Sequence, residues 1–426
     1  MPDDDTTTPD DPTTPRDPDA TGAANTPDGA PDNTPDGAPA AATPGGGAPD
    51  QPTRSELRQG NGSGGSRWWI YAIAGVAVLI VAAGIALAVS SGNSPTTRQV
   101  AVATTTTTAP PAGPTCPLTG LPAPGGKVPA RPALGVKIGN YPSDRPSAGL
   151  NHADIVFEEP VEGAITRLLA VFQCQGASLV GDLRSAREPD VGILSQLSNP
   201  LFVHAGGINP VINLLQNSAL IDDDLYSGGR GSAIITEPGR VAPYATFANT
   251  ASLWAFNPND TTPPAPIFQY SKALPAGAVP GSGASAHIPF SSTSDVTWTW
   301  DPSGNDYLRS YATGPDTHVD GAQSAATNVI IMTVQTSIGP WYENNVGGKE
   351  VEVNALGSGP VVILRNGAAI TGTWNRGSLT QPNVFTTSSG QRITLAPGNT
   401  WEELVPTGVN ITVTPSAGSA TTTTGG

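Results

Sequence analysis

The sequence has few of the residues that build metal and catalytic centres. Its 426 residues include two cysteines, two methionines and four histidines. It has no HExxH zinc motif, no GxSxG nucleophile elbow and no P-loop, and its glycine-rich run GNGSGG lies in a polar segment near the N-terminus. Four scattered histidines make a zinc site improbable, because such a site needs three or four ligands. We therefore expect neither a metal ion nor a cofactor.

Positive charge is also scarce. Lys and Arg together number 20 against 35 Asp and Glu, so the formal net charge is −15. Residues 1–67 hold 12 acidic residues and 4 arginines, which accounts for −8 of that charge. The remainder is only mildly acidic and favours neither nucleic acid nor an anionic membrane surface as a partner. Residues 1–67 also contain almost nothing that could form a core, and we predict a disordered tail there.

One long apolar run interrupts this polar composition. Residues 68–89, WWIYAIAGVAVLIVAAGIALAV, are 22 residues without a charge, and about 20 apolar residues span a bilayer as a helix. The run is too long for a signal peptide and begins far into the chain, so we expect a retained transmembrane helix. Arg54, Arg58 and Arg67 precede it and only Arg98 follows closely. The positive-inside rule then places the tail in the cytoplasm and the remaining chain outside the cell membrane.

The chain beyond this run begins with a stalk and then folds. Residues 90–115 are rich in Thr, Pro and Ala and predict an extended tether. Both cysteines, Cys116 and Cys174, lie beyond the apolar run, where an oxidising environment favours disulfides. We predict a disulfide between them; the alternative is two unpaired buried thiols.

The folded part predicts an α+β protein with two domains. Residues 116–256 alternate short apolar runs, such as ALGVKIGN, SLVGDLRS and LFVHAGG, with helical segments that begin near Pro189 and Pro210. This order is typical of an α/β domain with parallel strands. Residues 257–415 contain period-two segments such as VTWTW and VIIMTVQTS, separated by NG and SG turns, and predict mostly antiparallel β structure. Residues 416–426 resemble a second disordered tail.

Two arginines stand three residues apart in the stretch GDLRSAREPD. If the preceding run is a strand that leads into a helix, Arg184 and Arg187 lie at its carboxyl end beside free helix amides, and His204 reaches the same edge from the next strand. Such an edge would bind an anion. Alternatively, the arginines pair with internal carboxylates and His204 bonds a backbone carbonyl. Residue type does not decide, because a guanidinium binds carboxylate or phosphate equally well. The internal carboxylates in question are Glu158, Glu159 and Glu162.

Two further pairs are candidates for the same site or a second one. Glu162 and Arg167 flank a glycine turn in VEGAITR and could be a supporting ion pair or a site acid beside a site cation. His318 and Asp320 lie two residues apart in YATGPDTHVDG, where the carboxylate could orient the imidazole for acid–base work. The alternative for this second pair is a turn that caps its own loop.

Several segments, taken together, resemble the YerB-like lipoprotein family. They occur in the family's order, cover nearly all of residues 116–406, and include CPLTGLP, RPALGVKIGN, GDLRSARE, FVHAGG, HVDG and PGNTWEELVP. The resemblance implies an N-terminal α/β domain followed by a β-rich C-terminal domain, and it implies no reaction because the family is catalogued as a domain of unknown function. Typical members are lipid-anchored through an N-terminal cysteine, whereas Cys116 lies too far inside this chain for lipidation. The matching polar positions are Glu162, Arg167, Arg184, Arg187, His204, His318 and Asp320.

These observations predict a membrane-anchored, extracytoplasmic envelope protein. Our first hypothesis is that it binds an anionic envelope ligand, such as a wall glycan, a teichoic-type polymer or a peptide carboxylate, at the edge formed by Arg184, Arg187 and His204. One alternative is an envelope hydrolase that uses His204 or His318 as a general base. The other is a scaffold that docks other envelope proteins, which predicts an exposed apolar patch.

Overall fold

The computed structural model describes residues 113–343 and 348–417. The predicted tail at 1–67, the apolar run at 68–89 and all of the predicted stalk except residues 113–115 lie outside the described residues. Most of the predicted C-terminal tail, residues 418–426, also lies outside them. Within the described part of the chain, no helix is both long and apolar enough to cross a membrane.

The described chain is mostly β structure with a few short helices. The early strands are β1 (Leu134–Gly139), β2 (Ile155–Val161), β3 (Ile165–Phe172), β4 (Val180–Gly181), β5 (Leu201–His204), β6 (Ile221–Asp224), β7 (Ile235–Thr236) and β8 (Thr246–Ala248). The later strands are β9 (Ser285–Pro289), β10 (Asp295–Asp301), β11 (Asp306–Tyr311), β12 (Gly314–Pro315), β13 (Ala325–Ala326), β14 (Asn328–Glu343), β15 (Gly348–Asn354), β16 (Gly357–Arg365), β17 (Ala368–Arg376), β18 (Val384–Thr386), β19 (Thr400–Pro406) and β20 (Thr412–Thr414). The α-helices of the described residues are α2 (Glu188–Leu194), α3 (Asn209–Gln216) and α4 (Thr250–Trp254).

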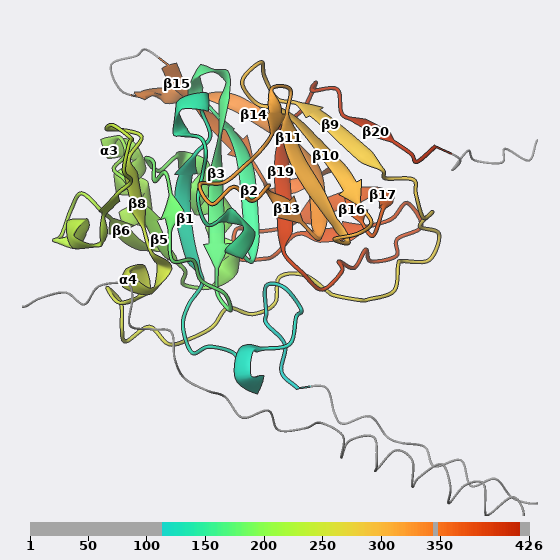
Figure 1. Cartoon of the computed structure of the whole chain (residues 1–426), viewed down its shortest axis with the longest axis horizontal. Helices are drawn as coiled ribbons and strands as arrows, with labels where there is room; N and C mark the ends of the chain where they lie inside the picture. The colour runs from blue at the N-terminus through green and yellow to red at the C-terminus, as the bar shows by residue number, and fades with distance from the viewer. Residues whose placement is uncertain (1–112, 344–347, 418–426) are drawn as a thin grey trace, which may run out of the picture. The chain divides into compact units, whose positions relative to one another are not determined.

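One 11-stranded sheet contains strands from both halves of the described chain. Its order is β18-β17-β16-β14-β19-β2-β3-β1-β5-β6, and β15 pairs with β14. The halves meet where β19 pairs in parallel with β2 (Figure 1). In this pairing Trp401 lies opposite Val156. The domain boundary predicted near residue 257 falls in the connection between α4 and β9, and strands from both sides of it share this sheet.

Both faces of the large sheet are buried. Along β2, Val156 belongs to one apolar cluster and Phe157 to another, as the alternation of side chains along a strand requires. The first cluster continues into a six-stranded sheet through Trp298 of β10. The second includes Val191 of α2 and Val211 of α3. Burial on both faces explains why strands such as ITRLLAVF are apolar almost throughout.

The α/β prediction is correct for only part of the first half. Strands β1, β5 and β6 are parallel neighbours, and α2 and α3 lie between them in the chain. Strand β3, however, is antiparallel to both β1 and β2. The β-rich second half is confirmed, including the hairpin at Asn366 and Gly367 that joins β16 to β17.

The predicted strand SLVGDLRS is much shorter than expected. Only Val180–Gly181 forms a strand, β4, and it belongs to a separate three-stranded sheet with β7 and β8. The next two residues bond to two different segments: Asp182 O accepts from Gly139 N at 2.9 Å, and Leu183 N donates to Thr246 O at 2.7 Å. No regular ladder therefore continues toward α2, and the two arginines do not lie at the end of a parallel strand.

The predicted disulfide between Cys116 and Cys174 is confirmed. Both residues are buried and pack with Ala123 and the half-buried Val128. The bond therefore ties the beginning of the described chain to the segment that follows β3.

A buried carboxyl on β19 makes stability depend on pH. Glu402 is 2% exposed; its Oε1 accepts from Asn383 Nδ2 at 3.0 Å, and its Oε2 has no partner among the described residues. Burial raises the pKa of Glu402 from 4.5 to about 7. The folded protein therefore keeps a proton that the unfolded chain releases between these values.

We expect Glu402→Gln to flatten this pH dependence. In the wild type, the contribution of Glu402 to the free energy of unfolding is fully present below pH 4.5 and declines through pH 7, by up to about 3 kcal/mol. Glutamine carries no such proton. Urea unfolding at pH 5 and pH 8 should therefore show the variant gaining on wild type at the higher pH. The same stability difference at both pH values would contradict the raised pKa.

Candidate functional site

Three of the residues predicted for a site form one ion-pair cluster. Arg187 Nε donates to Glu162 Oε2 at 2.8 Å, and Arg187 Nη2 bonds the other oxygen of the same carboxylate. Arg167 Nη2 lies 3.6 Å from Glu162 Oε1, and Glu343 Oε2 lies 3.1 Å from Arg187 Nη2. Burial alone would raise the pKa of Glu162, but the hydrogen bond and charge of Arg187 lower it to about 2. Arg187 is 1% exposed, so its charge interacts with these buried carboxylates and not with solvent.

His204 is enclosed beside the same segment. Ala205 N donates to Arg184 O at 3.0 Å, which places the backbones of the two segments side by side. The buried His204 ring lies between Gly206 O, 2.8 Å from Nδ1, and Asp222 Oδ1, 2.7 Å from Nε2. Burial lowers the pKa of His204, but the hydrogen bonds with Asp222 and Gly206 and the charges of Asp222 and Asp224 together outweigh it, and the net shift is upward. Both ring nitrogens thus serve internal acceptors.

Arg184 is the more exposed of the two arginines. Its Nη1 donates to Pro243 O at 2.9 Å, and its Nε lies 3.6 Å from Asp144 Oδ1. Arg184, Arg187 and His204 therefore have separate internal partners and do not form an open cationic edge.

His318 and Asp320 have different partners. Asp320 Oδ1 accepts from Ala322 N at 3.0 Å and so caps its own turn. His318 Nε2 lies 2.9 Å from Ser324 Oγ, which itself donates to Asp316 Oδ2 at 2.8 Å. Since the serine proton goes to Asp316, the histidine must donate through Nε2. Burial lowers the pKa of His318, so this ring is neutral at the end of a larger polar network.

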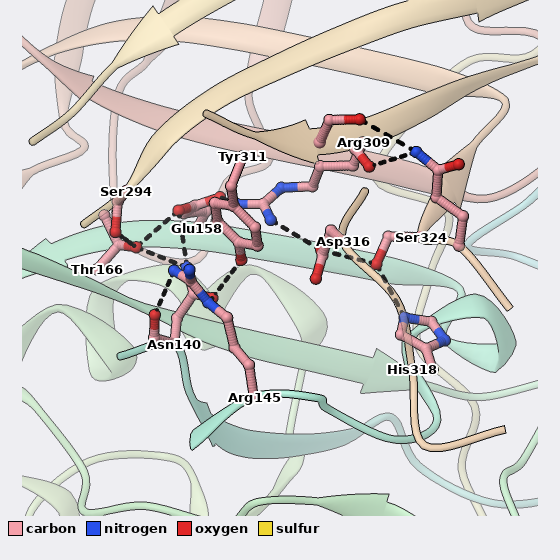
Figure 2. A network of polar contacts seen from close by, with 12 residues as sticks. Asn140, Arg145, Glu158, Thr166, Ser294, Arg309, Tyr311, Asp316, His318 and Ser324 are labelled. Carbon is pink, nitrogen blue, oxygen red and sulfur yellow. Dashed lines mark hydrogen bonds and ion pairs between the residues drawn. The ribbon is translucent and has the colours of Figure 1, made fainter. Parts of the chain in front are cut away.

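The network is centred on two fully buried charges, Arg309 of β11 and Glu158 of β2 (Figure 2). Arg309 Nη2 donates to Glu158 Oε2 at 2.5 Å, and Arg309 Nη1 donates to Asp316 Oδ2 at 2.8 Å. Glu158 Oε1 accepts from Thr166 Oγ1 at 2.7 Å and from Asn140 Nδ2 at 3.1 Å. The network therefore joins the large sheet to the six-stranded sheet.

Arg145 is the least buried cation of this network. Its Nη2 donates to the backbone oxygens of Asn140 and Thr293 at 2.6 and 2.9 Å, and its Nε donates to Asn140 Oδ1 at 3.2 Å. Its Cζ lies 3.4 Å from the ring centre of Tyr311, whose hydroxyl also donates to Asn140 Oδ1, at 2.6 Å. Across residues 113–343 and 348–417, Arg145 forms no ion pair with a carboxylate and its Nη1 has no hydrogen-bond acceptor.

A third carboxyl of the network is neutral. Glu403 of β19 accepts a hydrogen bond from Trp298 Nε1 at 2.7 Å. Burial and the neighbouring Glu158 raise the pKa of Glu403 well above its usual value. Counted formally, the carboxylates of Glu158 and Asp316 then balance the guanidiniums of Arg145 and Arg309, so the formal charges of the network cancel.

An open pocket of about 300 Å³ adjoins the network, and we call it the Arg145 pocket. Its lining residues are Pro142, Arg145, Pro146, Tyr311, Thr313, Pro315, Asp316 and Thr317. Ligand pockets commonly measure roughly 300–1,000 Å³ and combine apolar walls with a few placed polar groups. The Arg145 pocket has this character and is small, so it suits a small molecule or the end of a larger one.

A second pocket, of about 260 Å³, is lined in part by His152, His318 and Asp320. The three residues do not amount to a metal centre, since within the described ranges no group of His, Cys, Asp or Glu is arranged to hold a metal ion.

Sequence reasoning missed the residues of the Arg145 pocket. Arg145 stands between two prolines and two serines in PSDRPS, a pattern typical of an ordinary surface loop. Arg145 and Tyr311 both donate hydrogen bonds to Asn140 Oδ1, but Tyr311 lies on a strand 171 residues after Asn140 in the sequence. One local signal existed: Asp316 lies two residues before His318 in the segment already chosen for its histidine and aspartate.

The comparisons with known proteins agree with this architecture. The N-terminal domain of DUF3048, a protein of unknown function, matches residues 118–262, and its C-terminal domain matches residues 286–401. YerB of Bacillus subtilis (strain 168), whose name marks it as a candidate lipoprotein, is 28% identical over 302 residues, which are 68% of this chain and 86% of the relative. The crystal structure of the Bacillus subtilis YerB protein superposes with a TM-score of 0.60 at 23% identity, over 70% of this chain and 99% of that one. This chain belongs to the YerB-like DUF3048 family.

Proposed function

We propose that this chain is an extracytoplasmic envelope protein that binds a carboxylate-bearing ligand in the Arg145 pocket. The location is supported by the similarity to a relative named as a lipoprotein and by the disulfide, which persists in oxidising compartments. The uncharged run at residues 68–89 supports attachment through one transmembrane helix with the N-terminus in the cytoplasm.

The geometry of Arg145 is the observation that supports a carboxylate as the ligand. Hydrogen bonds to Asn140 and Thr293, together with the ring of Tyr311, hold the guanidinium in place before any ligand arrives. A group that is already ordered loses little conformational entropy on binding. The free Nη1 can therefore donate to a carboxylate in a charge-assisted hydrogen bond.

The charge of the pocket favours a single carboxylate over a polyanion. Arg145 is the one Lys or Arg among the residues that line the pocket, and the formal charges of the network behind it cancel. A phosphate polymer gains affinity from several cations at once. Of the three ligand types considered from the sequence, a peptide carboxylate therefore fits best, and the proposed site moves from Arg184, Arg187 and His204 to Arg145.

The acid–base hydrolase has less support. It needs a histidine that can accept a proton from a substrate or water. His204 is fully enclosed with both ring nitrogens engaged, and the ring of His318 bonds Ser324 and, among the described residues, no carboxylate that could orient it as a base.

We expect N-acetyl-alanyl-alanine to bind the full-length protein in detergent, and Arg145→Ala to weaken this binding at least tenfold. A hydrogen bond to a charged group contributes about 1.5–3 kcal/mol, which corresponds to this loss. Isothermal titration calorimetry measures both affinities. Arg184→Ala is the matched control, because it removes a partly exposed arginine outside the pocket and should bind as wild type does. Undiminished binding by a folded Arg145→Ala protein, or no binding by the wild type, would refute the proposal.

A further inference from the structure

Asp316 is the second charged side chain that lines the Arg145 pocket. Its Oδ2 accepts two hydrogen bonds, from Arg309 Nη1 and from Ser324 Oγ, each at 2.8 Å. Within the part of the chain that the structure describes, its Oδ1 accepts none, and Figure 2 shows this oxygen directed away from Ser324. The backbone of Asp316 is also fixed, since its N–H donates to Arg309 O at 3.1 Å. Asp316 thus presents one free acceptor oxygen on an ordered side chain.

Arg145 and Asp316 line one pocket without forming an ion pair with each other. Each is held by other groups: Arg145 by two backbone carbonyls and an aromatic ring, Asp316 by an arginine and a serine. Neither side chain can swing toward the other without giving up these bonds. The pocket therefore presents a fixed donor of positive charge and a fixed acceptor of negative charge.

We infer that the ligand of the Arg145 pocket is a small zwitterion, a free amino acid or a dipeptide, whose carboxylate binds Arg145 and whose ammonium group binds Asp316. This inference rests on the proposed function, because it assigns the ligand class of the same pocket. Because a zwitterion carries no net charge, its binding adds no net charge to the network behind the pocket. The volume of about 300 Å³ limits the ligand's size.

The remaining lining residues suit such a ligand. An ammonium group has three N–H donors and needs acceptors beyond a single carboxylate oxygen. The hydroxyls of Thr313 and Thr317 line the same pocket and can supply them. The prolines at 142, 146 and 315 form rigid apolar walls against which a short side chain can pack.

Three related probes test the inference on the full-length protein in detergent. Alanyl-alanine carries both charges, N-acetyl-alanyl-alanine carries only the carboxylate, and alanyl-alanine amide carries only the ammonium. We expect alanyl-alanine to bind at least tenfold more tightly than the acetylated probe, and the amide to bind more weakly than either. Equal affinity for the first two would overturn the zwitterion and leave the carboxylate site standing. Failure of all three to bind would overturn both proposals.

A variant and a change of pH locate the ammonium contact. Asp316→Asn keeps an oxygen for Arg309 and Ser324 but removes the charge, so it should reduce the affinity for alanyl-alanine to that for the acetylated probe. Raising the pH from 7 to 9 deprotonates the ligand's α-amino group, whose pKa is about 8, and should weaken only the zwitterion. This second measurement needs no variant and decides the question even if Asp316→Asn does not fold. An affinity ratio that stays constant with pH would overturn the inference.

Discussion

Replacing Arg309 with methionine should lower the free energy of unfolding by about 3–5 kcal/mol, because it leaves two buried carboxylates without their counter-charge. Glu158 is fully buried, so water cannot replace the lost guanidinium beside it, and Asp316 is only 3% exposed. Urea unfolding followed by tryptophan fluorescence measures the loss, since Trp298 and Trp401 pack beside this network.

Two further variants identify the source of that loss. Adding Glu158→Gln to Arg309→Met removes one of the uncompensated charges and should recover part of the stability. Arg145→Met also removes an arginine that contacts the Tyr311 ring. Arg145, however, is half-buried and has no carboxylate partner among the described residues. Its loss should therefore lower the free energy of unfolding by only about 1 kcal/mol. Equal losses from the two arginine variants would mean that the buried ion pairs are not what stabilises this region.

Removing the disulfide should have a comparable effect. Cys116 and Cys174 are separated by 58 residues, and closing a loop of this length stabilises by about 4 kcal/mol in the chain-entropy model. We therefore expect the Cys116→Ala, Cys174→Ala double variant to lose about this amount in urea unfolding at pH 7. Wild type treated with dithiothreitol should lose the same amount, and the double variant should not respond to it. A wild type whose stability is unaffected by full reduction would contradict the estimate.

The parts of the fold that local patterns determine could be predicted from the sequence. Strands such as ITRLLAVF are apolar runs between turn residues, and the NG turn at Asn366 specifies its hairpin. The disulfide followed from having only two cysteines on one side of the apolar run. In each of these cases the information lies in a few neighbouring residues or in a simple count.

The rest depends on contacts between distant segments. SLVGDLRS has the composition of a strand, but the backbone of Leu183 bonds to Thr246. No pattern within the segment itself predicts that contact. Arg187, which was chosen for a site, is buried against carboxylates from distant segments, including Glu343, which lies 156 positions later. Arg145 was overlooked because a loop arginine becomes noteworthy only when Asn140, Thr293 and Tyr311 are seen around it.

The parallel pairing of β2 with β19 has a consequence for how the protein is made. Ile155 pairs with Thr400, so a chain synthesised or exported from its N-terminus must keep β2 waiting for a partner that arrives 245 residues later. Such distant pairing gives the fold a high contact order, and high contact order slows folding. Until β19 arrives, β2 presents an unpaired edge that other chains can join. Chaperones that hold the emerging chain would therefore matter most between the appearance of these two strands.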